Sequence, residues 1–243
     1  MRSNLGLLLG AALFATNPMS VSAQSSDEPV QTVEDSSESP KIEFSANVGI
    51  VSDYRFRGLS LSNRNPAIQG GFDISMDNGL FVGTWASSVS DTGGSNVEVD
   101  IYGGYGGSAA GLDYTVTAIA YVYPGGTGVD YYEFTAAAEK TVGSATVGVL
   151  VGYVPDQTNF PGDNLYISGT AGYAIPDTPI SLTARLGREA SAVSKKWDWE
   201  AGVSYDHGSF STSLTYVDSD AGGPAESGRL GQSGVVASLT ASF

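Results

Sequence analysis

Apolar and polar residues alternate with a period of two over most of the chain, which is the pattern of β-strands and not of helices. In the last stretch the apolar positions are Val235, Ala237, Leu239, Ala241 and Phe243, with serine and threonine between most of them. We count twelve such segments, near 42–57, 66–76, 80–90, 95–106, 111–123, 130–140, 144–154, 164–174, 180–188, 197–206, 209–218 and 233–243. The pattern predicts an all-β protein of about twelve strands.

The connections between these segments alternate between tight and longer ones. The tight ones, such as 77–79 and 206–208, have the residues of short reversals. The longer ones lie near 58–65, 91–94, 124–129, 155–163, 189–196 and 219–232. Outer-membrane barrels show this asymmetry, and pairing of the last strand with the first would remove the raw edges. The sequence therefore predicts a transmembrane antiparallel up-and-down β-barrel, with both termini on the periplasmic side.

The composition of the strand faces indicates which face meets lipid. On the first segment Ile42, Phe44, Val48 and Ile50 share one face, and charged residues share the other. Many apolar positions are only Ala, Gly or Val, which would pack a thin core poorly but suit a lipid-facing wall. We expect the apolar face outside, the charges in the lumen, and interfacial girdles formed by Tyr54, Phe56, Trp85, Tyr132, Phe134, Trp197, Trp199, Tyr205 and Phe243.

The N-terminal 40 residues differ from the rest. Residues 1–23 have a basic start, an apolar run too short to span a bilayer, and small residues up to Ala23, as in an export signal cleaved after that residue. Residues 24–40 are acidic and poor in bulky apolar groups, which predicts a disordered leader before a barrel over 41–243. We therefore expect the protein in the bacterial outer membrane, in contact with its lipid.

Charge and candidate chemistry exclude several function classes. The formal net charge of −15 makes nucleic acid an unsuitable partner, and the absence of cysteine excludes disulfides and thiol chemistry. The single histidine, His207, lies between Asp206 and Ser209 in a tight turn, where sequence neighbours rarely adopt triad geometry. A calcium loop beginning at Asp218 would have Arg229 at its twelfth position, where glutamate is required. We expect no enzyme activity, no metal site and no cofactor.

Three stretches carry a family resemblance: 52–58 (SDYRFRG), 66–73 (PAIQGGFD) and 79–87 (GLFVGTWAS). They resemble the TorF-type porin family of exported proteobacterial proteins, most specifically over residues 44–105. The resemblance implies an outer-membrane barrel and a channel, and it brings neither a substrate nor catalytic residues. The final strand also resembles the C-terminal signature of outer-membrane barrels, which implies recognition by the barrel-assembly machinery through the strand ending in Phe243.

The leading functional hypothesis is a porin-like channel for passive diffusion of small polar solutes or ions. Twelve strands lie between barrels filled by side chains and barrels with an aqueous channel. The connections are short, so we expect no loop folded inside as a plug, and selectivity would come from the wall. The pore-lining candidates are Asp53, Arg55, Arg57, Gln69, Asp73, Glu98, Asp100, Asp113, Glu133, Glu139, Arg185, Asp198 and Glu200. Acidic residues outnumber basic ones among them, which favours a mild cation preference.

Arg55 and Arg57 leave two alternatives open. They could form a positive strip that narrows the pore, or they could pair with Asp53, Asp73 or Glu98, because charges inside a barrel need partners. The second functional hypothesis follows from the same pairing: a non-conducting structural or adhesive barrel whose lumen is filled by paired charges. A continuous water path would favour the channel, and a side-chain plug would favour the filled barrel.

Overall fold

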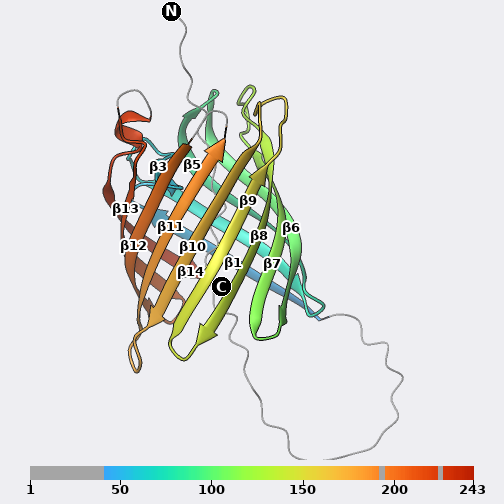
Figure 1. Ribbon diagram of the computed structural model, residues 1–243, viewed down its shortest axis with the longest axis vertical. Helices are drawn as coiled ribbons and strands as arrows, with labels where there is room; N and C mark the ends of the chain where they lie inside the picture. The colour runs from blue at the N-terminus through green and yellow to red at the C-terminus, as the bar shows by residue number, and fades with distance from the viewer. Residues whose placement is uncertain (1–40, 192–194, 224–226) are drawn as a thin grey trace, which may run out of the picture.

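The computed structural model describes residues 41–191, 195–223 and 227–243 as a closed antiparallel barrel. Figure 1 shows the strands running obliquely around it. The wall consists of β1 (Ile42–Val51), β4 (Ala67–Met76), β5 (Leu80–Thr92), β6 (Ser95–Ala109), β7 (Leu112–Val122), β8 (Tyr131–Val142), β9 (Ala145–Val154), β10 (Asn164–Ala174), β11 (Ile180–Ser191), β12 (Lys195–His207), β13 (Phe210–Ser219) and β14 (Gly234–Ser242). The prediction of a twelve-stranded up-and-down barrel is confirmed.

Closure joins the two ends of the described chain. β1 pairs with β14, with Val48 opposite Ala241. Phe243 and Ala46 exchange two main-chain hydrogen bonds of 2.8 and 3.1 Å, so the last residue extends the ladder beyond the end of β14. The terminal strand therefore has no free edge. Its recognition by an assembly machinery stays a prediction, and the expected signal and leader lie outside the described residues.

The apolar side chains of the wall point outward, as the alternation predicts. Phe44, Val48 and Ile50 are 65, 50 and 54% exposed, although they belong to a continuous sheet. The opposite face of the strands carries polar and charged groups that are buried or half-buried, including Glu133 and Asp198. Such an inside-out arrangement suits hydrocarbon around the barrel and polar contents within it. No helix in the described part of the chain is long and apolar enough to cross a bilayer.

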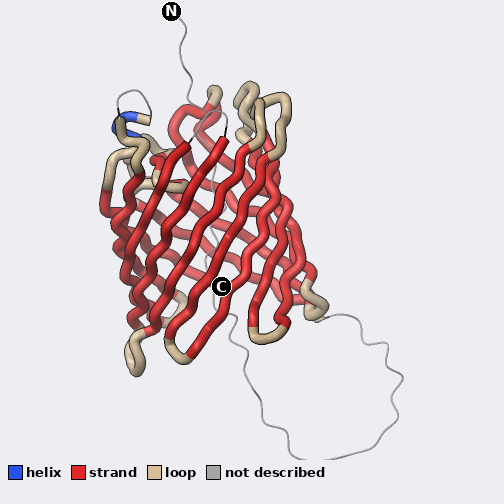
Figure 2. Tube along the Cα trace, viewed as in Figure 1, coloured by secondary structure: helices blue, strands red, loops and turns tan. Residues whose placement is uncertain are grey.

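The two ends of the barrel differ, and Figure 2 shows longer connections at the upper end than at the lower. At the short-turn end β6 and β7 are joined by only two residues. At the long-loop end the connections include 123–130, 155–163 and a stretch with a 3₁₀ turn, η1 (Gly228–Leu230). Two expected loops are shorter than predicted. Only residues 93–94 separate β5 from β6, and β11 continues to Ser191. At both places strands occupy residues that the sequence pattern assigns to loops.

The first connection contradicts two predictions. β1 ends at Val51 and not near residue 57, and residues 52–66, here called the inward segment, contain a separate two-stranded sheet of β2 (Arg55–Phe56) and β3 (Leu59–Ser60). Tyr54, Phe56 and Leu61 are buried, so the segment fills the lumen instead of extending the wall. The expectation that no loop folds inside as a plug is therefore wrong. The apolar residues of this short segment have a core to join, inside the barrel.

Candidate functional site

The inward segment is a hairpin with its tip at Arg57 and Gly58. Both residues have positive φ angles, 46 and 84°, as a two-residue turn between twisted strands requires. A Cβ atom on Gly58 would lie 2.8 Å from the Cβ of Ser219 and 2.9 Å from that of Asp198. Only glycine lets the tip approach β12 and β13 this closely. The hairpin therefore starts at β1, and its tip reaches β13 and β12, the second and third strands from β1 in the wall.

One side of the inward segment is anchored by an apolar cluster inside the lumen. Tyr54, Phe56 and Leu61 pack there with buried residues of the wall strands and of two long-loop connections: Ala67, Val89, Ile119, Tyr121, Tyr131 and Val154 on strands, and Tyr123 and Phe160 in the connections. The Tyr54 ring meets the Trp85 ring edge-on, with centroids 5.5 Å apart. The Leu61 carbonyl also accepts a 2.8 Å hydrogen bond from the main-chain nitrogen of Ser90 on β5. This side is closed in the way a soluble core is closed, by packed aromatic and aliphatic groups.

Tyr54 also touches a pair of acidic residues on β6. Its hydroxyl donates a hydrogen bond of 3.3 Å to Glu98, which is fully buried next to the buried Asp100. Burial raises the pKa of Tyr54, and the neighbouring Glu98 and Asp100 carboxyl groups raise it further. The phenol therefore stays protonated and available as a donor.

The hairpin tip carries a buried ion pair across the lumen. Arg57 Nη2 donates to Glu133 Oε1 on β8 over 2.5 Å, and the two side chains are only 6 and 1% exposed. The guanidinium also lies over the Tyr166 ring, 4.1 Å from its centroid. Burial alone would lower the pKa of Arg57, but the carboxylates of Glu133 and Glu189 outweigh it and raise the pKa above the ordinary value. The cation is therefore permanent, and buried carboxylates balance its charge.

A second group of charges on β11 and β12 continues this network. Lys196 donates to the main-chain carbonyl of Arg57 over 2.7 Å and pairs with Glu189 over 2.7 Å. Arg185 pairs with Asp198, and with Glu200 over 2.8 Å. The tip is thus held between charged side chains of three wall strands.

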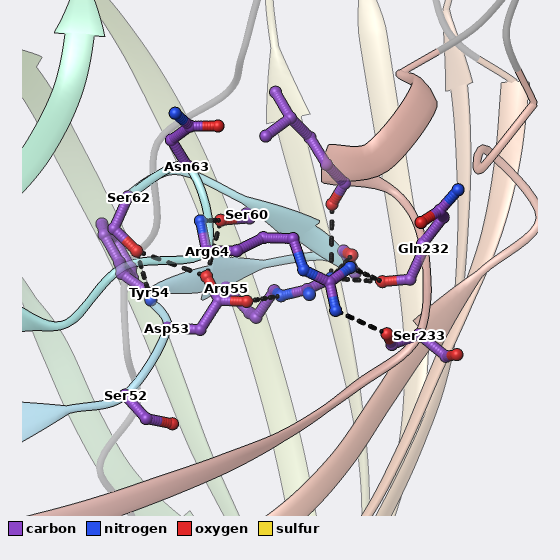
Figure 3. A network of polar contacts seen from close by, with 12 residues as sticks. Ser52, Asp53, Tyr54, Arg55, Ser60, Ser62, Asn63, Arg64, Gln232 and Ser233 are labelled. Atoms are coloured by element: carbon purple, nitrogen blue, oxygen red, sulfur yellow. Dashed lines mark hydrogen bonds and ion pairs between the residues drawn. The ribbon is translucent and has the colours of Figure 1, made fainter.

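The other side of the inward segment meets the last long connection through a set of polar contacts. Arg55 pairs with Asp53 over 2.6 Å and donates to the carbonyl of Gln232 over 2.8 Å. Arg64 donates to the carbonyls of Gln232 and Ser233 over 3.1 and 2.9 Å. Figure 3 shows both arginines directed at this stretch of main chain, residues 227–233, here called the closing loop. We call this line of guanidinium-to-carbonyl contacts the seam.

The short-turn half of the lumen is open, in contrast to the half that holds the inward segment. Asp113 on β7 and Glu139 on β8 are directly opposite each other in the register and are exposed, although they lie on the lumen face. Thr170 and Thr183 face the same space and are exposed as well. The interior is therefore a vestibule that opens at the short-turn end and is closed beneath the long loops. Two acids placed side by side give it a local negative charge.

The predicted pore-lining residues fall into four groups. Those on the inward segment and not on a wall strand are Asp53, Arg55 and Arg57. Those buried on the lumen face of the wall are Gln69, Glu98, Asp100, Glu133 and Asp198. Those half-buried there are Asp73, Arg185 and Glu200, and those exposed in the vestibule are Asp113 and Glu139. All of them lie inside the barrel, and their role in conduction stays a prediction.

The pairing alternative for the two arginines is the one that the structure shows. Arg55 pairs with Asp53, as that alternative allows, but the partner of Arg57 is Glu133 and none of the three acids named beforehand. Three girdle assignments are wrong, because Tyr54 and Phe56 are buried in the lumen and Trp85 packs against them. The other six girdle residues are exposed on the outer face, Tyr132, Phe134, Trp197, Trp199, Tyr205 and Phe243.

The sequence reading missed Glu189, Lys196 and Arg64. The sequence pattern predicts a loop over 189–196, although Glu189 continues the period-two lumen face of Arg185, which is a usable signal. Nothing in the local sequence indicates the seam, because its acceptors are main-chain carbonyls. His207 ends β12 at the short-turn end, exposed and stacked on Tyr205 with centroids 6.5 Å apart.

Solved structures with a similar fold include two porins. The NanC porin superposes with a TM-score of 0.56 at 10% sequence identity, covering 83% of this chain and 99% of that chain. The KdgM porin, solved in complex with disordered oligogalacturonate, gives 0.57 at 10% identity, covering 82 and 99%. At this identity the likeness shows a shared fold. A search of curated protein sequences finds no significant match.

A comparison with family models gives the family directly. The narrower TorF-type assignment stays a prediction, because the matching model does not carry that name. The model is described as a bacterial protein of unknown function (Gcw_chp) and matches residues 34–243, so the chain belongs to this family.

Proposed function

We propose that the protein is an outer-membrane channel for passive diffusion of small polar solutes or ions, closed in this state by the inward segment. The observation that carries the proposal is the two-sided seal. The segment is anchored to one part of the wall by an apolar cluster and meets the closing loop through hydrogen bonds from Arg55 and Arg64. Water and polar solutes can replace such hydrogen bonds, whereas they cannot replace buried apolar contacts. The seam is thus the side on which the lumen opens.

The route of a solute through the barrel has two parts, the seam and the vestibule. With the orientation of outer-membrane barrels, the vestibule faces the periplasm and the seam faces outside. A solute crossing the barrel passes the seam between Arg64 and the closing loop, and then the acids Asp113 and Glu139. The vestibule disfavours polyanions, which separates this chain from a porin that holds oligogalacturonate.

Loosening the seam tests the proposal. Liposomes with wild-type protein are expected to swell slowly in small sugars and amino acids, and those with Arg55→Ala plus Arg64→Ala several-fold faster, because the main-chain acceptors then lose their donors. Lys140→Ala, which removes an exposed cation from the outer face, serves as the control and should swell like wild type. Equal swelling of all three proteins would contradict a seam that opens.

The acids of the vestibule predict a mild cation preference. Asp113 and Glu139 face each other across neighbouring strands in an exposed position, so their field raises the local cation concentration. In planar bilayers under a salt gradient, the reversal potential of the seam-loosened protein should indicate cation selectivity. Adding Asp113→Asn and Glu139→Gln should move the reversal potential toward zero. A reversal potential that these two changes leave in place would assign selectivity to another part of the lumen.

A second candidate function rests on the buried network at the hairpin tip. Arg57, Glu133, Glu189 and Lys196 compensate one another almost without solvent contact, as a permanently filled lumen would require. Such a barrel would serve a structural or adhesive role and would stay closed to every solute. This candidate predicts no swelling from the wild type or from the seam variant, with normal folding of both.

A further inference from the structure

The outer face of the barrel carries a groove over β10, β11 and β12, strands that lie side by side in Figure 1. Its volume is about 330 Å³, and it is lined by Leu165, Ile167, Gly169, Leu186, Arg188, Ala190 and Trp197. Gly169 and Ala190 leave space between the larger side chains, and a Cβ added to Gly169 would have its nearest neighbour 4.0 Å away. The groove is therefore an apolar trough on the face that meets lipid.

One end of this trough is cationic. Arg188 lies on the outward face, opposite Ile167 on β10 and Trp197 on β12. Its guanidinium lies over the Trp197 ring, 5.3 Å from the centroid, and among the described residues no carboxylate pairs with it. Lys195, directly opposite Ala190, adds a second exposed cation two residues nearer the long-loop end. A charge on the lipid-facing side of a barrel is costly unless something compensates it.

The position of these cations along the barrel wall indicates which kind of ligand fits the groove. Arg188 and Lys195 lie near the ends of β11 and β12 at the long-loop end, next to the exposed indole of Trp197. Interfacial tryptophan marks the headgroup region of a bilayer. From there the trough runs past Ile167 to Leu186 and Gly169, which are deeper in the wall. A ligand that fits has an anionic headgroup above and an acyl chain below.

We propose that this groove binds a phosphorylated glycolipid of the outer leaflet, with a phosphate on Arg188 and Lys195 and an acyl chain along Ile167, Leu186 and Gly169. The inference rests on the proposed outer-membrane location and orientation, but not on conduction. Basic residues at the membrane interface attract anionic headgroups, and the Arg188 guanidinium presents several donors to phosphate oxygens. The apolar trough supplies the area that holds the chain.

Native mass spectrometry of the full barrel, folded in detergent, tests this site with diphosphorylated lipid A as the probe. The wild type is expected to retain one lipid A molecule, and Arg188→Gln to lose roughly tenfold in affinity through the missing phosphate contact. Gly169→Leu should lower the affinity similarly, because the new side chain fills the trough where no neighbour obstructs it. Lys140→Gln removes an outward cation near the short-turn end and should bind like wild type.

Two further measurements distinguish the contribution of the phosphate group from that of the acyl chain. Dephosphorylated lipid A should bind weakly to every variant, and an excess of inorganic phosphate should leave wild-type binding largely intact, because the acyl chain contributes as well. Equal binding of lipid A to wild type and Arg188→Gln would overturn the proposal, as would release of lipid A by inorganic phosphate alone. Heat-modifiable gel mobility confirms folding of each variant. Intact lipid binding together with failure of the seam-loosened variant (Arg55→Ala plus Arg64→Ala) to conduct would refute only the proposed conduction.

Discussion

A protein in which residues 55–60 are replaced by Gly-Gly is expected to form channels with about tenfold higher single-channel conductance than the wild type, because the lumen then lacks its hairpin. The replacement is feasible, because the Leu61 nitrogen already donates to the Tyr54 carbonyl over 2.8 Å. Two glycines can connect these paired residues as a tight turn. Tyr54 and Leu61 remain in the shortened segment and still pack in the apolar cluster. Planar-bilayer recordings measure the effect.

The expected order of conductance is the strictest part of this prediction. The wild type should conduct least, Arg55→Ala plus Arg64→Ala more, and the Gly-Gly replacement most, since the first variant opens one side and the second removes the obstruction. Glu133→Gln can be added to the Gly-Gly protein so that no carboxylate is left without Arg57. Circular dichroism and heat-modifiable mobility verify the barrel. A folded Gly-Gly protein that conducts no better than the wild type would contradict the inward segment as the barrier.

The second large effect concerns the stability of the barrel. Arg57→Ala is expected to lower the free energy of unfolding by about 3–5 kcal/mol, because it leaves the Glu133 carboxylate buried without its cation. Adding Glu133→Gln should recover a large part of the loss, since the amide is neutral and can still accept from Tyr121. Urea unfolding in detergent, followed by tryptophan fluorescence, measures both changes.

The control for this experiment is Lys41→Ala, which breaks the exposed pair with Glu43 at the start of the barrel and should leave stability unchanged. A small loss for Arg57→Ala would mean that water reaches Glu133 once the guanidinium is gone. That outcome would contradict a tightly packed tip, and it should then be accompanied by increased conductance of the same variant.

The wall of this protein can be predicted from sequence because each strand carries its own evidence. Period-two alternation identifies the segments, and the exposed Phe44 and Ile50 confirm the orientation of the faces. The inward segment could not be predicted in this way, because alternation continues from Ile50 through Tyr54 and Phe56 although the chain leaves the wall at Val51. The local clue is Arg57-Gly58 between Phe56 and Leu59, which has the form of a hairpin turn.

The candidate site depends on contacts that no local pattern contains. The lumen face identified Glu133 as an inward acid, but its pairing with Arg57 joins residues 76 positions apart. The seam is even harder to predict from the sequence, because every residue has a carbonyl acceptor. Only the fold brings the closing loop to Arg64. The alternation pattern therefore identifies which charges lie inside, and the three-dimensional arrangement decides which of them are compensated.

The seam has a consequence for the order in which the molecule is built. Arg55 comes early in the chain and its acceptor Gln232 lies 177 residues later, so their contact cannot form until almost the whole polypeptide is present. The hairpin lies between the first two wall strands and must already be enclosed when β14 docks against β1. The barrier that we propose is therefore completed by the same event that joins the first and last strands.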